Sequence, residues 1–426
     1  LHQRPETDAF TAEAARSSGS ECSQSAEGAE GPRLHYNAQA EEVQTLEQRG
    51  GSLSVRMRNF NSFAKAVLLE QSLGEVRGRA GGAGAPLSVL DLCCGKGGDL
   101  KKFANSGVTE YCGVDVAEAA LKVLLGRVQG VARDATRARH GLLGQVGLPL
   151  REVSLLHADC WQIRLAPFLD TAAHHGTARL EGLRQAWFHL ISSQMACHYA
   201  FVTEASAEML LRNVSERLCD GGLFVGTMPD ASRIVSAQLD VWERRRELRM
   251  GNDLFKIEFE PKQWERVTGN LEQWCGLGAS LGDGGDVFGV SYRYSLVDAV
   301  DKCSEPLVHW GTFQQLAQRH GLVLQMGPRP LSEVVGPEVQ GDGAEKAELG
   351  RLRRLYFYKG GMNCADTSQE REALQFYVAF AFRKEAGSAP GALGCGELSA
   401  ALRRLHHSED DGARFPTGPG DIVHAL

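Results

Sequence analysis

Apolar and polar positions along the middle of the chain follow two different rhythms. Continuous apolar runs that end in a polar or turn residue are expected to form buried strands, and they lie at 89–93, 111–116, 154–160, 188–195 and 223–229. Apolar residues recur at helical spacing between these runs, which predicts helices at 99–107, 117–131 and 203–222. Strands that alternate with helices indicate an α/β fold with a mostly parallel central sheet flanked by helices.

This patterning is absent from both ends of the chain. Residues 1–33 are rich in Ala, Ser, Glu and Gly and are expected to be disordered, and residues 385–426 form a similar low-complexity tail. We therefore expect one folded domain over 34–384. Within it, four weakly patterned segments are predicted to be insertions whose roles stay open: 126–153, 163–186, 262–286 and 335–370.

Composition narrows the class of protein. The 426 residues are 43% hydrophobic and 23% charged, which is typical of a globular chain. A net charge of −7 argues against binding nucleic acid with the whole surface, but it allows a local basic channel. The 11 cysteines include no CxxC pair, so neither a disulfide scaffold nor a zinc ribbon is indicated. No apolar stretch approaches the ~18 residues of a membrane span.

A glycine-rich turn, CCGKGG at 93–98, follows the first predicted strand. It is not a P-loop, because Lys96 is followed by Gly97 and lacks the required spacing. It is not the dinucleotide fingerprint G-x-G-x-x-G either, because the last glycine position falls at Leu100. Metal binding by Cys93 and Cys94 is disfavoured, since neighbouring strand residues point to opposite faces. A tight turn remains.

Three acids, Asp91, Asp115 and Asp159, lie within or at the ends of the first three predicted strands. Asp115 comes 20 residues after Gly95, which is the usual span from a glycine turn to a carboxylate that binds ribose. We therefore expect an adenosine pocket at the carboxyl edge of the sheet. Because a diphosphate fingerprint is missing, S-adenosylmethionine is favoured over a nicotinamide cofactor, although each acid could instead cap a helix.

Seven motifs in this order resemble the mRNA cap guanine-N7 methyltransferase family: HYN (35–37), RNFNSFAK (58–65), VLDLCCGKGGDL (89–100), VDVAE (114–118), SSQMACHYAF (192–201), GGLFVGTMPD (221–230) and FYVAFAFRK (376–384). The resemblance covers 34–384, which it implies is the catalytic domain. It implies a Rossmann-like class I methyltransferase fold, with insertions forming the cap-binding side. It also implies S-adenosylmethionine as cofactor, S-adenosylhomocysteine as product and no metal. The implied partners are 5′-capped RNA, other capping enzymes and factors associated with RNA polymerase II, and the implied location is the nucleus.

The resemblance further implies residues that surround S-adenosylmethionine. Asp91 would lie near the ammonium group, Asp115 would bind the ribose hydroxyls and Asp159 the adenine amino group. The methionine part would meet the remaining four residues: Lys65 at its carboxylate, Gly95 at the turn, and Gln194 and Tyr199 closing over it.

A second set is implied for the cap. Glu305 would accept hydrogen bonds from N1–H and the 2-amino group of guanine, an arrangement that adenine cannot satisfy. The remaining cap residues would be Asn37, Asn61, Lys96, His198, Pro229 and Tyr377. Guanine N7 has a free lone pair, so no general base is expected, and Glu305, His198 and Tyr199 would act by orientation.

One residue complicates the expectation for Glu305. Pro306 follows Glu305 where the family usually has an aromatic residue, and its fixed φ could re-aim the glutamate.

Basic residues for the RNA path would be Arg56, Arg58, Lys101, Lys102 and the run 243–249. Two alternative functions stay open: a methyltransferase of another small-molecule acceptor, and a cap-binding subunit without catalysis.

Overall fold

The computed structural model describes residues 52–82, 84–139, 150–169, 187–275, 287–335, 350–352, 367–387 and 422–424. Its central sheet has the strand order β10-β11-β5-β4-β1-β2-β3-β12. The five inner strands are parallel: β1 (Ser88–Leu92), β2 (Glu110–Asp115), β3 (Glu152–His157), β4 (Phe188–Gln194) and β5 (Leu218–Pro229). Three strands flank them, each joined to its inner neighbour by antiparallel pairing: β10 (Leu322–Pro330), β11 (Tyr377–Lys384) and β12 (Ile422–His424). The predicted α/β fold with a mostly parallel centre is confirmed.

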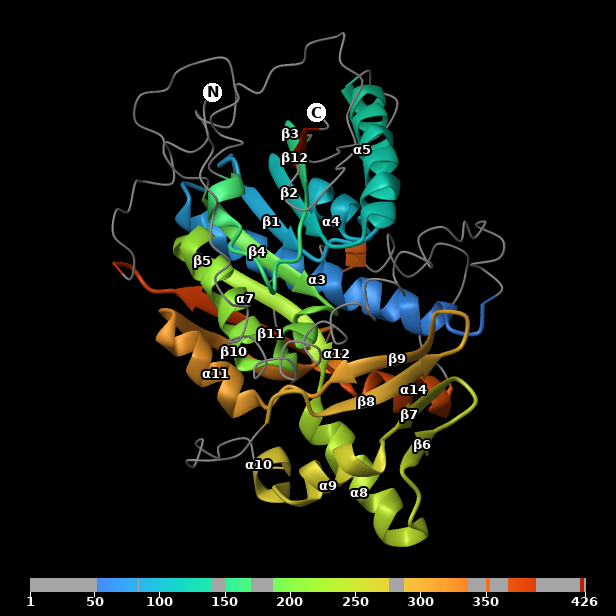
Figure 1. Ribbon diagram of the computed structural model, residues 1–426. Helices are drawn as coiled ribbons and strands as arrows, with labels where there is room; N and C mark the ends of the chain where they lie inside the picture. The colour runs from blue at the N-terminus through green and yellow to red at the C-terminus, as the bar shows by residue number, and fades with distance from the viewer. Residues whose placement is uncertain are drawn as a thin grey trace, which may run out of the picture.

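Helices cover both faces of this sheet (Figure 1). One face packs against α3 (Val55–Arg79), α4 (Leu100–Asn105) and α5 (Glu118–Arg139). The other packs against η1 (Cys197–Val202), α7 (Glu204–Arg217) and α11 (Trp310–Arg319). Since β1 lies between β2 and β4, the winding direction reverses beside β1, and ligands of doubly wound sheets bind at the carboxyl ends of strands at such a point.

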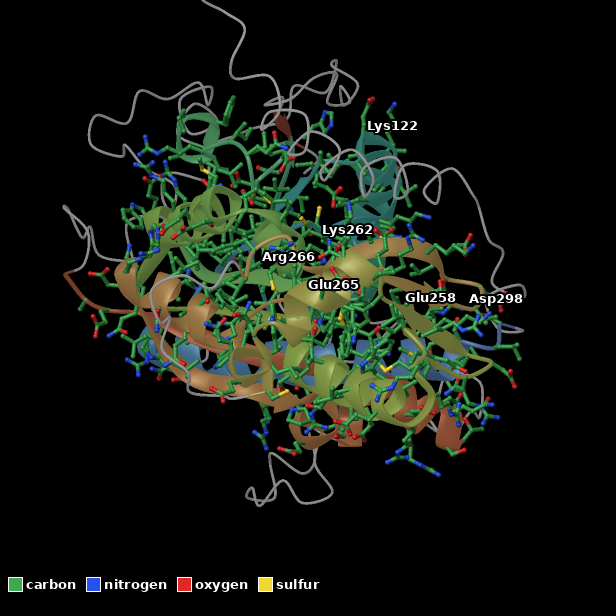
Figure 2. The ribbon with its side chains drawn as sticks, turned by 60° about the horizontal axis from the view of Figure 1, so that its bottom comes forward. Lys122, Glu258, Lys262, Glu265, Arg266 and Asp298 are labelled. Atoms are coloured by element: carbon green, nitrogen blue, oxygen red, sulfur yellow. The ribbon has the colours of Figure 1, made fainter. Side chains whose placement is uncertain are left out.

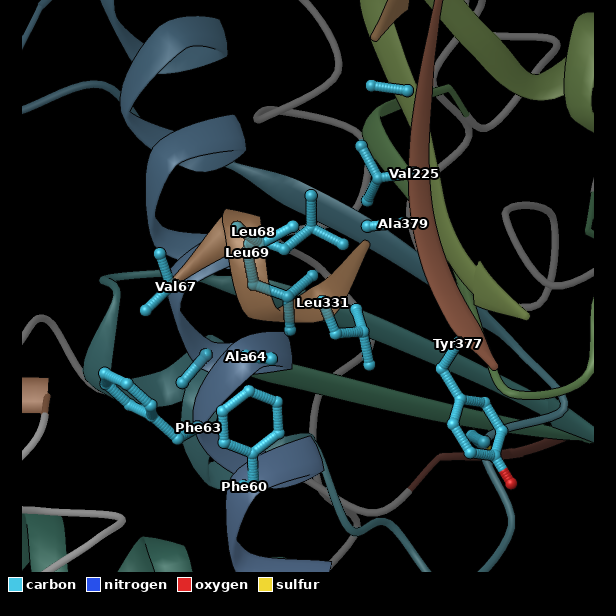
Figure 3. Packing of buried hydrophobic residues seen from close by; sticks show 14 of the residues in the cluster. Phe60, Phe63, Ala64, Val67, Leu68, Leu69, Val225, Leu331, Tyr377 and Ala379 are labelled. Carbon is cyan, nitrogen blue, oxygen red and sulfur yellow. The ribbon is translucent and has the colours of Figure 1, made fainter. Parts of the chain in front are cut away.

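The long helix α3 is held to the sheet by a continuous apolar stripe. Figure 3 shows Leu68 and Leu69 of α3 on the side of the helix that faces Leu331 of α12 (Leu331–Val334) and Val225 of β5, with Phe63 on the other side. All five side chains are at most 3% exposed. The amino-terminal end of α3 is thereby fixed above the carboxyl end of the sheet, near Tyr377 (Figure 3).

A second, antiparallel sheet follows β5 in the chain and has the order β6-β7-β8-β9. Its strands are β6 (Arg249–Gly251), β7 (Phe255–Glu258), β8 (Ser291–Leu296) and β9 (Val300–Pro306). The helices α8 (Ala231–Arg245), α9 (Pro261–Thr268) and α10 (Leu271–Cys275) lie beneath it in Figure 1, and α14 (Ser368–Leu374) lies beside it. Residues 262–275 of the predicted insertion 262–286 are therefore structural, because Trp264 and Trp274 are buried there.

Hydrogen bonds beyond its own strand pairing help to hold the second sheet in place. The turn between β8 and β9 is joined to the start of α3, where the Leu53 amide donates to Asp298 Oδ2 at 3.2 Å. The Arg266 guanidinium of α9 donates to the carbonyl of Phe288 at 2.7 Å, just before β8. Together these contacts hold β8 and β9 at both ends.

The predicted helix 203–222 is too long. The helix α7 ends at Arg217, and β5 already begins at Leu218. The reason is tertiary: the buried Lys384 ammonium of β11 donates to the carbonyls of Ser215 at 2.6 Å and Leu218 at 3.1 Å, where the helix stops. The Gly221 turn (φ 75°) that suggested the helix end lies inside the strand instead.

Substituting Lys384→Met should lower the free energy of unfolding by about 1–3 kcal/mol. The change keeps the length of the side chain but leaves two carbonyls at the end of α7 without their donor, and it removes the ammonium 4.7 Å from the Trp187 ring. Urea unfolding would measure the loss. As a control, Lys122→Met removes a half-exposed ion pair with Glu118 and should cost less than about 1 kcal/mol; equal losses in both variants would contradict the prediction.

Two buried acids at the amino ends of β2 and β3 make stability depend on pH. Glu110 and Glu152 are cross-strand partners, and burial, with the nearby Glu110 charge, raises the pKa of Glu152 from 4.5 to about 8. The unfolded chain ionises at lower pH, so folding loses stability as pH rises from 4.5 to 8, by up to about 1.4 kcal/mol per pH unit. Glu152→Gln should therefore be more stable than the parent at pH 9, by up to about 5 kcal/mol, and within about 1 kcal/mol of it at pH 5. A parallel dependence in both proteins, by urea unfolding, would contradict this.

Candidate functional site

The glycine turn after β1 is a strained, tightly packed bend. Cys93, Gly95 and Gly97 all have positive φ, at 56°, 52° and 70°. A Cβ on Gly97 would lie 2.1 Å from Leu124 Cδ1 of α5, so only glycine fits there. A Cβ on Gly95 would meet no atom of the described residues within 4 Å, so the space beside Gly95 is open.

Asp115 ends β2 and faces this turn. Its Oδ2 accepts a 2.7 Å hydrogen bond from the Gly95 amide, and its Oδ1 accepts one of 2.7 Å from the Ala117 amide. Burial raises the pKa of Asp115, and these amides partly oppose the rise. The Val116 amide is a third backbone donor to this carboxylate. The structure therefore brings the predicted ribose carboxylate to the predicted glycine.

Asp91 lies deeper than its predicted role suggests. It is 2% exposed within β1 and accepts a 2.9 Å hydrogen bond from Tyr111 Oη. Burial, together with the neighbouring Asp99 charge, raises the pKa of Asp91 to about 7. Asp91 therefore lies beneath the glycine turn. Because its pKa is about 7, its charge near neutral pH can change with what binds above the turn.

Lys65 is one of two lysines that form ion pairs with Asp99. Its ammonium donates to Asp99 Oδ2 at 2.9 Å, and Lys102 donates to Asp99 Oδ1 at 2.6 Å. Although burial raises the pKa of Asp99, the ammonium groups of Lys102 and Lys65 lower it well below its ordinary value. Two cations thus share one anion, and Asp91 is a second acid that interacts with the same two lysines. The expectation that Lys102 contacts RNA is wrong, since its side chain is 4% exposed.

The remaining cofactor candidates lie at neighbouring strand ends. Asp159 follows β3 and accepts a 3.0 Å hydrogen bond from the Trp161 amide, so it also stabilises the local turn. Gln194 ends β4, where Nε2 donates to Ser192 Oγ at 3.2 Å and Oε1 accepts from Thr227 Oγ1 at 3.1 Å. Both residues face the same carboxyl edge as Asp115, because their strands are parallel.

The short helix η1 supplies His198, predicted for the cap, and Tyr199, predicted for the cofactor. The rings of His198 and Tyr199 lie 4.2 Å apart, and Tyr199 Oη lies 3.4 Å from Cys303 Sγ of β9. His198 is 2% exposed, and neither ring nitrogen has a hydrogen-bond partner among the residues that the structure describes. Burial lowers the pKa of His198 to about 3, so the ring is neutral and keeps unused hydrogen-bonding capacity.

Glu305 comes from the second sheet and points inward. It lies directly opposite Tyr292 in the β8–β9 pair, and Tyr292 Oη donates to Glu305 Oε2 at 2.6 Å. Burial raises the pKa of Glu305 from 4.5 to about 7, and the Tyr292 hydrogen bond opposes the rise. Pro306 is the last residue of β9 and pairs with Ser291, a strand-end position that tolerates proline, so it does not turn Glu305 out of the sheet.

The other predicted cap residues are placed as follows. Tyr377 of β11 and Pro229 of β5 are cross-strand partners. Tyr377 also lies near Tyr292, whose pKa is raised by burial and by nearby groups that include Glu305 and Tyr377. Asn61 of α3 has a buried Oδ1 that meets no hydrogen-bond donor within the described part of the chain. Lys96 is half-buried in the glycine turn. Asn37 lies outside the described residues.

Sequence reasoning missed two functional candidates, Asp99 and Tyr292. Asp99 could have been suspected as the acid that closes the GKGGD motif beside two lysines. Tyr292 and Tyr294 in SYRYSL are two residues apart and both buried, so they share a strand face. That alternation is visible in the sequence, but the partner of Tyr292 is not.

The proposed RNA patch at 243–249 has a mixed environment. The Arg244 side chain at the end of α8 is 76% exposed and lies 4.0 Å from Asp240, and one glutamate lies on each side of the three successive arginines. Figure 2 shows Lys262, Glu265 and Arg266 side by side on α9, again with both signs of charge. This lobe has no single-sign field, which weakens the case for an RNA path there.

Two classes of site are absent from the part of the chain that the structure describes. No group of three or more His, Cys, Asp or Glu side chains there could hold a metal ion. No helix among those residues has the length and apolar character needed to cross a bilayer.

Comparison with known proteins places the chain in a family. The family model for the mRNA (guanine-N(7))-methyltransferase domain matches residues 21–385. The mRNA cap guanine-N(7) methyltransferase 1 of Oryza sativa subsp. japonica is 32% identical over 355 residues, which are 82% of this chain and 80% of the relative. The protein of the same name from Arabidopsis thaliana is 30% identical over 380 residues, 88% of this chain and 86% of the relative. The chain therefore belongs to the mRNA (guanine-N(7))-methyltransferase family.

Proposed function

We propose that this chain transfers a methyl group from S-adenosylmethionine to N7 of the terminal guanine of GpppRNA, using the site between the two sheets. The observation that carries the proposal is the family match over 21–385, which spans both the Gly95–Asp115 contact and the buried Glu305. S-adenosylmethionine supplies a methyl group activated by a sulfonium. The chain's own residues have to bind and orient the two reactants.

The donor side has the chemistry that an adenosyl amino acid requires. Asp115 is proposed to accept hydrogen bonds from the ribose hydroxyls, and the open space beside Gly95 allows a ligand to approach the backbone. The ammonium group of Lys65, in the cluster with Asp99 and Lys102, is proposed to meet the methionine carboxylate. Asp91, Asp159, Gln194 and Tyr199 are proposed for the ammonium group, the adenine and the wall of this pocket.

The cap side needs no proton transfer, because guanine N7 carries a lone pair and no hydrogen. Glu305 is proposed to read the guanine edge, and the neutral His198 and Tyr199 to line the base. Tyr377 and Pro229 would bound the opposite side, and Asn61, Lys96 and Asn37 would meet the ribose and phosphates. Catalysis would then rest on alignment of N7, methyl carbon and sulfur.

We also propose nuclear location, with other capping enzymes and polymerase II-associated factors as partners. Support comes from the relatives, which are named mRNA cap methyltransferases. The 5′ end of capped RNA would be recognised through its guanine and phosphates and not through its sequence.

A methyl-transfer assay tests the function directly. The full chain is incubated with S-adenosylmethionine labelled in the methyl group and with GpppRNA, and nuclease digestion identifies the labelled nucleoside. We expect N7-methylguanosine. Label on a generic small acceptor in competition with GpppG would favour a different methyltransferase, whereas binding of GpppG without turnover would favour a non-catalytic subunit. Calorimetry with S-adenosylhomocysteine would show whether the donor pocket binds.

A further inference from the structure

We propose that Tyr292 is a positioning residue that holds Glu305 ionised and correctly oriented, so that the Tyr292–Glu305 pair decides whether guanine or adenine is accepted. This inference rests on the proposed function, because it concerns how the cap base is chosen. Tyr292 would act through Glu305, by holding its carboxylate in place.

The geometry supports an anchor and not a passing contact. Tyr292 and Glu305 are direct cross-strand neighbours in β8 and β9, and both are at most 8% exposed. The Tyr292 hydroxyl donates to Glu305 Oε2 at 2.6 Å, a short distance typical of a bond to a charged acceptor. The ring of Tyr292 is held in turn by Phe259, 5.9 Å away between centroids. The donor is therefore fixed before any ligand arrives.

The protonation state of Glu305 changes what it can recognise. As a carboxylate it offers only acceptors, which match the N1–H and 2-amino donors of guanine. As a neutral acid it offers one donor and one acceptor, which match N1 and the 6-amino group of adenine. Loss of the charge therefore removes guanine binding and also creates a fit for the wrong base.

The named neighbours of Glu305 other than Tyr292 do little to stabilise its ionised form. The titratable groups that face it or its immediate neighbours are Tyr294 on β8, Cys303 on β9, Tyr377 on β11, and His198 and Tyr199 on η1. None of these named groups is a cation at neutral pH. Burial raises the pKa of Glu305 to about 7, and the Tyr292 hydrogen bond is what opposes that rise.

The sign of the pH effect follows from this balance. Above about pH 7 Glu305 is ionised and accepts guanine, and below it the acid is neutral. Removing a hydrogen bond to the charged form raises the pKa further. Tyr292→Phe should therefore move the acidic limb of kcat/KM for GpppRNA upward by about one to two pH units. The pKa of Asp91 is also raised to about 7, so the pH at which the acidic limb lies does not distinguish Asp91 from Glu305. The limb is assigned to Glu305 by its shift in Tyr292→Phe.

The experiment measures kcat/KM for GpppRNA and competition between GpppG and ApppA from pH 6 to 9. In Tyr292→Phe we expect about a tenfold loss of kcat/KM at pH 7.5 that recovers at pH 9, with the change in KM for RNA and not in kcat. Replacing Tyr292 by 3-fluorotyrosine, a stronger donor, should move the limb downward. Glu305→Gln, which is permanently neutral, should show a guanine preference that is low at every pH.

A matched control is Tyr294→Phe, which removes a buried hydroxyl from the same strand face and should leave the limb in place. S-adenosylhomocysteine binding should be unchanged in all variants, which reports an intact fold. A limb at the same pH in Tyr292→Phe and the parent would overturn the inference while leaving the proposed function standing. A parent chain that binds no GpppG at any pH would overturn both.

Discussion

Glu305→Ala should reduce kcat/KM for GpppRNA by about 100-fold or more while S-adenosylhomocysteine still binds. The truncation would leave the guanine N1–H and 2-amino donors unpaired in a buried pocket, at about 1.5–3 kcal/mol for each lost hydrogen bond to the charge. It would also leave the Tyr292 hydroxyl without its acceptor. The measurement is methyl transfer from labelled S-adenosylmethionine, with calorimetry on the product analogue.

The control for this substitution is Glu265→Ala on the exposed side of α9, shown in Figure 2. It removes the same charge from the same lobe and should leave turnover near that of the parent. Undiminished methylation by Glu305→Ala would remove this residue from the cap site. The site would then have to lie elsewhere between the sheets.

Asp115→Ala should weaken binding of S-adenosylmethionine and S-adenosylhomocysteine by about 100-fold or more. The carboxylate is proposed to bind two ribose hydroxyls, and losing two charge-assisted hydrogen bonds costs about 3 kcal/mol or more, with tenfold for every 1.4 kcal/mol. The same change removes the acceptor of the Gly95 and Ala117 amides, so the glycine turn should also loosen. Calorimetry measures the affinity.

Thermal unfolding without ligand separates these two effects. Asp115→Asn keeps one carbonyl acceptor and should be closer to the parent in stability than in affinity. If both variants bound S-adenosylhomocysteine as tightly as the parent, the ribose assignment would have to be abandoned. Asp159→Asn, whose predicted partner is the adenine amino group, provides a milder comparison in the same pocket.

The local elements of the site could be predicted because their signals are local. The run VLDL followed by CCGKGG predicted a strand and a tight turn, and Gly97 has positive φ against Leu124 as such a turn requires. The 20-residue spacing from Gly95 to Asp115 anticipated a contact that the structure shows at 2.7 Å. Parallel strands carry their carboxyl ends to one edge, so order along the chain was sufficient.

Other features depended on segments far apart in the chain. The end of α7 was misplaced because Lys384, more than 160 residues away, terminates the helix. Lys102 was assigned to RNA because a helix lysine is usually solvated, yet it is buried on Asp99 with Lys65. In both cases a tertiary partner overrode a local preference.

The amino-acid sequence alone determined the alternation of strands and helices, the glycine turn and the family motifs with their candidate residues. Only the tertiary structure decided which groups are paired and charged: that Asp99 is shared by two lysines, that His198 is neutral, and that Glu305 depends on Tyr292. The physical reason is that backbone preferences act over a few neighbouring residues. The charge state of a side chain depends on burial and on partners that folding brings from distant strands.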